Sequence, residues 1–136
     1  MLSELYYFPI SVLGVTETKL KNDRDALVNI NITGYNFLSQ PSCTNAGGVG
    51  FYVKDNLAYT HRLDLSAQKQ NDYESLGIEI QNNMGRNIIC GGVYRHPHGN
   101  VDAFLNHVNM IVENKYCEKK YCENIVKTNI VSYWET

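Results

Sequence analysis

The sequence predicts an α+β fold in which several short strands precede one amphipathic helix. The chain has 136 residues, of which 43% are hydrophobic and 19% charged, enough for the core of one modest domain or part of a larger one. Up to Arg95, short apolar or alternating runs are separated by Gly, Pro, Asn and Ser, as is typical of strands with hairpin connections. After Asn100 the apolar period becomes helical. This order favours layered sheets over a doubly wound fold.

Short apolar or alternating runs define the expected strands. Segment 88–95 is mostly apolar, so we expect it to lie centrally in its sheet. Segment 49–55 alternates apolar residues with small or polar ones, which predicts a half-buried strand with segment 57–65 as a plausible partner. Segments 73–80 and 88–95 are joined by a polar loop of hairpin type. The expected strands are, in chain order, 10–15, 35–40, 49–55, 57–65, 73–80 and 88–95.

The helix prediction rests on apolar residues at helical spacing, which form a single stripe. They are Val101, Phe104, Leu105, Val108, Ile111 and Val112. Asn100 is a suitable N-cap and Asp102 suits the first turn, and we expect the helix to end near Tyr116. Residues 122–136 have the pattern of a weak, strand-like tail.

Composition excludes several classes of protein. A net charge of −2 gives no overall basic surface for nucleic acid, and no apolar run is long enough to span a membrane. The N-terminal segment has no basic stretch of the kind that begins a secretory signal. The 4 cysteines contain no CxxC pair, which argues against structural zinc and favours free thiols in a reducing compartment. We therefore expect an intracellular protein, in the nucleus or cytoplasm.

Several motifs follow one another in a fixed order along the chain. They are VLGVTETKL, GYNF, GGVGFYVKD and YESLGIEI, followed by GVYRHPHGN and a helix. Together they resemble the endonuclease/exonuclease/phosphatase superfamily, in particular the apurinic-like endonuclease domain of non-LTR retrotransposons. The resemblance covers residues 1–121 as a partial domain and leaves 122–136 as a divergent tail. It implies a partial four-layer α/β/β/α sandwich and magnesium-dependent cleavage of a DNA phosphodiester.

The resemblance also implies roles for particular residues. Glu17 matches the metal-binding glutamate of the family, Tyr94 matches a tyrosine near the scissile phosphate, and Arg95 lies beside it. A single glutamate suits Mg²⁺, which takes few protein carboxylates and keeps several waters. Tyrosine and arginine can both donate hydrogen bonds to phosphate oxygens. Without the motif order, the alternatives are a solvated strand end for Glu17, a core or interface aromatic for Tyr94 and a surface charge for Arg95.

Other residues near these motifs have simpler interpretations. His96 and His98 flank Pro97 and have the spacing of a metal pair, but we favour surface-loop histidines. The pair of glycines at 47 and 48 suggests a tight turn rather than a phosphate cradle. Glu74 resembles a family position within a strand, and we assign it no catalytic role.

The sequence also lacks motifs that the family uses for hydrolysis. The family's first strand supplies an asparagine, and a Gly-Asp-Phe-Asn type motif follows the helix; neither occurs here. Hydrolysis needs a positioned base for water as well as a metal. We therefore expect a fragment that is inactive alone and that self-associates through uncovered strands. Two alternatives stay open: a non-catalytic binding or interaction remnant of the same fold, or part of a hydrolase of small phosphoesters.

Overall fold

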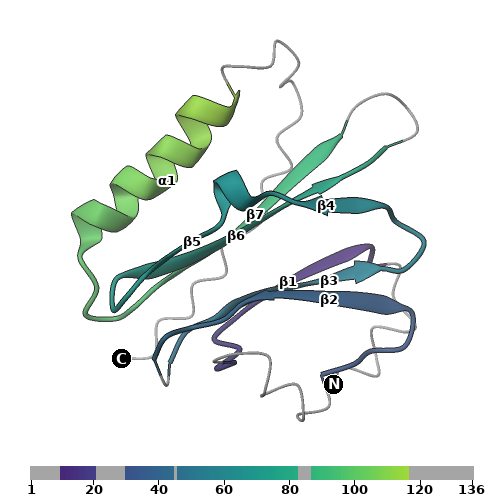
Figure 1. Cartoon of the computed structure of the whole chain (residues 1–136), viewed down its shortest axis with the longest axis horizontal. Helices are drawn as coiled ribbons and strands as arrows, with labels where there is room; N and C mark the ends of the chain where they lie inside the picture. The colour runs from purple at the N-terminus through teal and green to yellow at the C-terminus, as the bar shows by residue number, and fades with distance from the viewer. Residues whose placement is uncertain (1–9, 21–29, 45, 83–86, 117–136) are drawn as a thin grey trace.

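The computed structural model describes residues 10–20, 30–44, 46–82 and 87–116, which form two antiparallel sheets and a helix (Figure 1). The first sheet contains β1 (Val12–Thr16), β2 (Tyr35–Gln40) and β3 (Val49–Lys54). The second contains β4 (Tyr59–His61), β5 (Ala67–Lys69), β6 (Tyr73–Ile80) and β7 (Ile88–Arg95). The 3-10 helix η3 (Leu63–Leu65) lies between β4 and β5, and α1 (Val101–Tyr116) follows β7. The predicted α+β class is confirmed.

In the first sheet, β3 is the central strand and pairs with β1 on one side and β2 on the other. Its residues Phe51 and Val53 are 0% exposed, and Tyr52, which points to the opposite face, is only 5% exposed. The expectation of a half-buried strand is therefore wrong. The second face is covered because the Tyr52 ring packs against Phe37, at 4.6 Å between centroids, and its hydroxyl donates to the carbonyl of Ile30.

In the second sheet, β6 is paired on both edges: β7 lies along one, and β4 and β5 share the other. The expectation of a single strand over 57–65 that pairs with β3 is therefore wrong: only Tyr59–His61 is a strand, and Leu63–Leu65 is a 3-10 helix. The turn after β3 instead carries the chain to the other sheet, where Tyr59 pairs with Ile80. The expected central place of 88–95 is also not observed, since among the described strands β7 pairs with β6 alone. The β6–β7 hairpin itself is confirmed.

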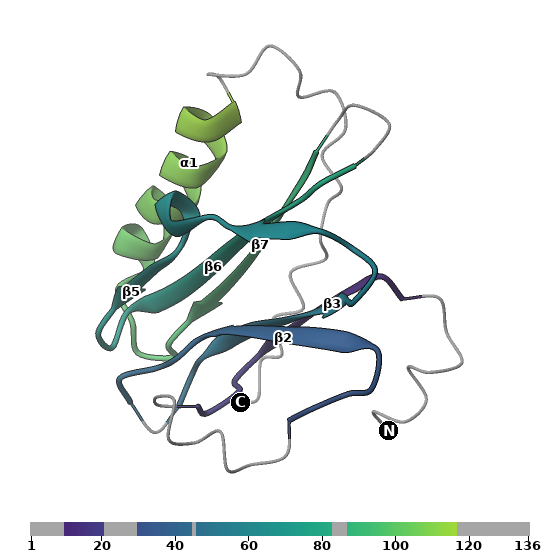
Figure 2. The ribbon, with the colours of Figure 1, turned by 45° about the vertical axis from the view of Figure 1, so that its right-hand side comes forward.

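The core lies between the two sheets, which are stacked face to face (Figure 2). Phe51 and Val53 of β3 meet Leu76 and Ile78 of β6, and all four side chains are 0% exposed. On the far side of the second sheet, α1 covers the outer face. The described residues thus supply a helix layer and two sheet layers; the fourth layer of the expected sandwich is not among them.

The helix α1 begins after Asn100, whose side-chain oxygen accepts a hydrogen bond from the backbone N–H of Ala103, so the predicted N-cap is confirmed. The predicted stripe is buried only in part: Val101 is 51% and Leu105 is 50% exposed. The buried contact is instead made by His107, which is 7% exposed. Its ring stacks on Tyr73 of β6, at 4.5 Å between centroids.

Two predictions fall outside the described residues. The strand-like tail at 122–136 and the outer limits of the expected domain, 1–121, cannot be compared with the structure, which describes 10–116 with gaps. Within the described part of the chain, no helix is long and apolar enough to cross a membrane.

Candidate functional site

Glu17 follows the last residue of β1 in an unusual backbone conformation. Its φ is 55°, and that of Lys19 is 58°, which is the left-handed region that side chains other than glycine seldom adopt. The segment is held from the neighbouring turn: the N–H of Lys19 donates to the carbonyl of Gly47 at 2.8 Å, and the N–H of Thr18 to that of Gly48 at 3.5 Å. The backbone that follows Glu17 is therefore held by the turn before β3.

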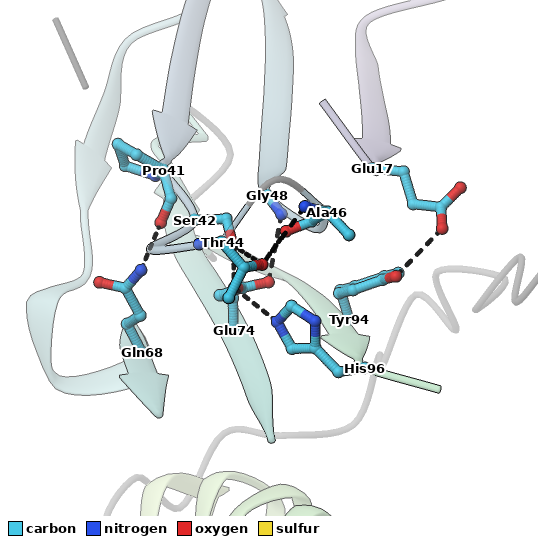
Figure 3. A network of polar contacts seen from close by, with 10 residues as sticks. All are labelled: Glu17, Pro41, Ser42, Thr44, Ala46, Gly48, Gln68, Glu74, Tyr94 and His96. Carbon is cyan, nitrogen blue, oxygen red and sulfur yellow. Dashed lines mark hydrogen bonds and ion pairs between the residues drawn. The ribbon is translucent and has the colours of Figure 1, made fainter. Parts of the chain in front are cut away.

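Tyr94 meets Glu17 from the opposite sheet. Its hydroxyl donates a hydrogen bond to Oε1 of Glu17 at 3.0 Å, although the two residues are 77 positions apart (Figure 3). One residue follows β1 and the other is the last but one of β7, so the contact bridges the two sheets at one end of the sandwich core. The structure thus brings together two of the three residues that the resemblance singled out.

The electrostatic surroundings keep Tyr94 protonated. Burial, followed by the hydrogen bond to Glu17 and the negative charge of Glu17 and Glu74, raises the pKa of Tyr94 to about 12, while the positive charge of Arg95 opposes this shift. The phenol is therefore neutral across the physiological range. It can donate a hydrogen bond to a carboxylate or a phosphate oxygen, but it cannot serve as a base near pH 7.

Arg95 takes a different direction from Tyr94 because successive residues of a strand point to opposite faces. Its Nη1 donates to the carbonyls of His96 at 3.1 Å, Pro97 at 3.4 Å and Gly99 at 3.3 Å. The structure therefore places this guanidinium on the loop before α1, and not in the hydrogen bond that joins the other two predicted site residues. Its charge still reaches Tyr94 electrostatically.

Behind this pair lies a buried polar cluster around Glu74, which is 1% exposed. Its Oε1 accepts a hydrogen bond from Oγ of Ser42 at 2.7 Å and lies 2.9 Å from Nε2 of His96; its Oε2 accepts from the N–H of Gly48 at 3.1 Å (Figure 3). The interpretation of His96 as a surface-loop residue is wrong, since it is 7% exposed, whereas His98 is exposed. A charge on an apolar strand face is the signal that could have predicted this cluster.

The glycine pair before β3 is required by this cluster and by the backbone. The φ values are 91° at Gly47 and 95° at Gly48. A β-carbon at Gly47 would lie 2.6 Å from Oε2 of Glu74, and one at Gly48 would collide with Oγ1 of Thr18. The turn therefore serves the architecture of the site, as the sequence suggested, and holds the segment that carries Glu17.

The donor set for a metal is sparse. Among the described residues, no group of three or more His, Cys, Asp or Glu side chains could hold a metal ion. Both oxygens of Glu74 are already engaged by protein donors, so, in the part of the chain that the structure describes, the exposed carboxylate of Glu17 is the acid of this pair that can reach a cation. A single carboxylate suits Mg²⁺, which binds through one or two carboxylates plus water and phosphate oxygens. It does not suit Zn²⁺ or Ca²⁺, which need more protein ligands.

Comparisons with known proteins identify no family. Neither a scan against models of protein families nor a search of curated proteins found a match for this chain. The case for a function therefore rests on the order of the motifs and on the geometry of the site.

Proposed function

We propose that this chain is part of a magnesium-dependent phosphodiester hydrolase domain that acts on DNA, with the four-layer sandwich of the endonuclease/exonuclease/phosphatase superfamily. One observation supports the proposal above others: Tyr94 donates to Glu17 across the two sheets at 3.0 Å. These residues were selected from two distant motifs for a metal role and a phosphate role, and nothing in their local sequence requires them to meet.

Each residue has a distinct task in this proposal. The exposed carboxylate of Glu17 would hold the cation. The neutral hydroxyl of Tyr94, which donates to Oε1 of Glu17 in this structure, would then turn to donate to a phosphate oxygen beside it. Arg95, whose guanidinium lies on the loop before α1, adds positive charge that reaches Tyr94 electrostatically without contacting it. Bound Mg²⁺ would supply charge stabilisation of the phosphoryl and leaving oxygens. The water-activating base is not assigned, because the Gly-Asp-x-Asn motif that carries it in the family does not occur in this sequence.

Metal binding is the first test, with Mn²⁺ as a paramagnetic substitute for Mg²⁺. We expect Mn²⁺ to broaden the NMR signals of the Glu17 amide and the Tyr94 ring selectively, and Mg²⁺ to compete. Glu17→Gln should abolish the selective broadening. Asp55→Asn is the matched control, since Asp55 is an exposed carboxylate just beyond the other end of β3. Broadening that is unaffected by Glu17→Gln would contradict the proposal and favour a non-catalytic interaction module.

Nicking of supercoiled plasmid tests the chemistry. We expect no magnesium-dependent nicking by this chain alone, because the described site has a candidate metal ligand and a phosphate donor but no assigned base. Robust nicking that Glu17→Ala abolishes would support the hydrolase and show that the expectation of inactivity is wrong. Nicking that survives Glu17→Ala would indicate a contaminating nuclease or a different site.

A further inference from the structure

Glu74 is a carboxylate placed among fully buried apolar side chains. It shares the inward face of β6 with Leu76 and Ile78, both 0% exposed, and is itself 1% exposed. Burying a charge is unfavourable unless hydrogen bonds replace the lost water, and an apolar residue of similar volume often serves stability as well or better. Here Ser42, Gly48 and His96 replace the water. Stabilisation of the core alone therefore does not explain why a carboxylate occupies position 74.

One set of contacts leads from Glu74 to Glu17. Oε2 of Glu74 accepts from the N–H of Gly48, and the carbonyls of Gly47 and Gly48 in turn accept from the N–H groups of Lys19 and Thr18. Gly47 lies so close that a β-carbon there would be 2.6 Å from the same Oε2. The carboxylate thus fixes the turn that holds the left-handed backbone at Glu17 and Lys19.

A second set leads from Glu74 to Tyr94. The two residues are directly opposite each other in the β6–β7 register, so their side chains share the inner face of the sheet. The His96 ring, bound to Oε1 of Glu74, makes a T-shaped contact with the Tyr94 ring, with 5.1 Å between centroids and 81° between planes. The backbone N–H of His96 donates to the backbone carbonyl of Asp72 at 2.9 Å. The contact with this imidazole therefore restricts the rotamer of Tyr94.

We propose that Glu74, acting through His96 and through the Gly47–Gly48 turn, is the positioning residue that sets the Glu17–Tyr94 pair. It touches neither a metal nor a phosphate. It connects the end of β1, which carries Glu17, with the end of β7, which carries Tyr94. Loss of its charge should therefore increase the conformational freedom of both residues. The inference rests on the proposed function only for its effect on metal binding; its effect on the pair is independent of any activity.

The experiment compares Glu74→Gln with Ser75→Ala in otherwise intact chain. Glu74→Gln keeps the shape but removes one acceptor oxygen, so the Gly48 N–H or the His96 contact is lost. Ser75→Ala removes a buried hydrogen bond to His107 from the next residue of the same strand, on the opposite face, away from the site. It therefore controls for a general loss of stability. The first readout is the ring ¹³C signal of Tyr94, assigned by Tyr94→Phe, without metal.

We expect Glu74→Gln to move the Tyr94 signal towards its position in Glu17→Gln, where the hydrogen bond is removed directly, and Ser75→Ala to leave it in place. Mn²⁺ affinity at Glu17 should fall about tenfold in Glu74→Gln, the lower end of what loss of an outer-shell partner costs a metal site. Unchanged methyl signals of Leu76 and Ile78 will show that Glu74→Gln is folded. If the Tyr94 signal is then unmoved in this variant, the proposal is overturned.

A second variant covers the case in which Glu74→Gln does not fold. His96→Gln retains an N–H for Glu74 but removes the ring beside Tyr94, and it should move the Tyr94 signal in the same direction; an unmoved signal would overturn the proposal. If wild-type protein shows no selective Mn²⁺ broadening, the proposed function fails, while the Tyr94 readout still decides whether Glu74 positions the pair.

Discussion

A substitution in the turn before β3 tests how closely Gly47 packs against the buried carboxylate of Glu74. Gly47→Ala adds a single methyl group at φ 91°, where it would lie 2.6 Å from Oε2 of Glu74 and 2.9 Å from Cε1 of His96. Gly34→Ala is a matched control. Gly34 has φ 88° in the turn before β2, and a β-carbon there would have no atom within 4 Å. The two substitutions share the backbone cost and differ in the contact with the cluster.

The expected magnitudes follow from that difference. Placing alanine in the left-handed region costs about 1–2 kcal/mol, and the reduced freedom of the unfolded chain returns about 0.4–1 kcal/mol. Gly34→Ala should therefore destabilise by about 1 kcal/mol. Gly47→Ala should add about 1–3 kcal/mol for overpacking against groups that cannot move without breaking hydrogen bonds. We expect it to lose about 2–4 kcal/mol in all.

Urea denaturation followed by circular dichroism measures both losses of stability. The midpoints can be compared if the slope of the unfolding free energy against urea concentration is the same in each variant. A Gly47→Ala loss that exceeds the Gly34→Ala loss by about 1 kcal/mol or more supports the cluster as described. Equal losses would show that the Glu74–His96 pair gives way freely. The reasoning about a fixed turn, and with it the support for Glu17, would then be wrong.

Three further results are expected. A double-mutant cycle with Glu17→Gln and Tyr94→Phe should give a coupling of about 0.5–1 kcal/mol in urea denaturation, modest because the hydrogen bond is solvent-exposed; additive effects would contradict the contact. Burial lowers the pKa of His107 below its value in the unfolded chain. As the pH falls, the unfolded state therefore binds the proton first. The contribution of His107 to stability should be complete above about pH 6.5 and decline as the pH falls from there towards the lowered pKa. His107→Gln should remove that decline in thermal melts taken across this range, and a decline that persists in His107→Gln would assign it to another group. Asn100→Ala should cost about 1 kcal/mol in urea denaturation, because the N-cap of α1 is lost; an unchanged midpoint would contradict the cap.

Local pattern predicted the elements of this fold well. The expected ranges 35–40, 73–80 and 88–95 coincide with β2, β6 and β7, because each is an apolar or alternating run closed by turn residues. The start of α1 was fixed by Asn100, whose side chain accepts the hydrogen bond that its position suggested. These features depend on a few neighbouring residues, so one sequence is enough to reveal them.

Pairing and burial were harder to predict because they depend on distant residues. Segment 57–65 has a strand-like composition, but nothing local states that Tyr59 pairs with Ile80 of β6 and not with β3. The second face of β3 carries Gly50 and Lys54, which suggested solvent, yet Phe37 covers Tyr52 between them. For β3 the error lies in what covers its second face. For 57–65 it lies in both the partner and the element, because only Tyr59–His61 is a strand and Leu63–Leu65 is a 3-10 helix.

The site shows the same division. Motif order singles out Glu17 and Tyr94, whereas the sequence alone suggests only a strand residue for Glu74 and a loop histidine for His96, which form the buried contact behind them. Yet period 2 places Glu74 in the same phase as Leu76, on the face that must enter the core. A carboxylate in that phase has to be either excluded from the fold or provided with donors. The sequence has candidate donors in the Ser42 hydroxyl and in the N–H groups of a glycine pair that allows close approach. An inward-phase acid is thus a predictor of a buried polar cluster, and in this chain that cluster lies directly behind the strand end that carries Glu17.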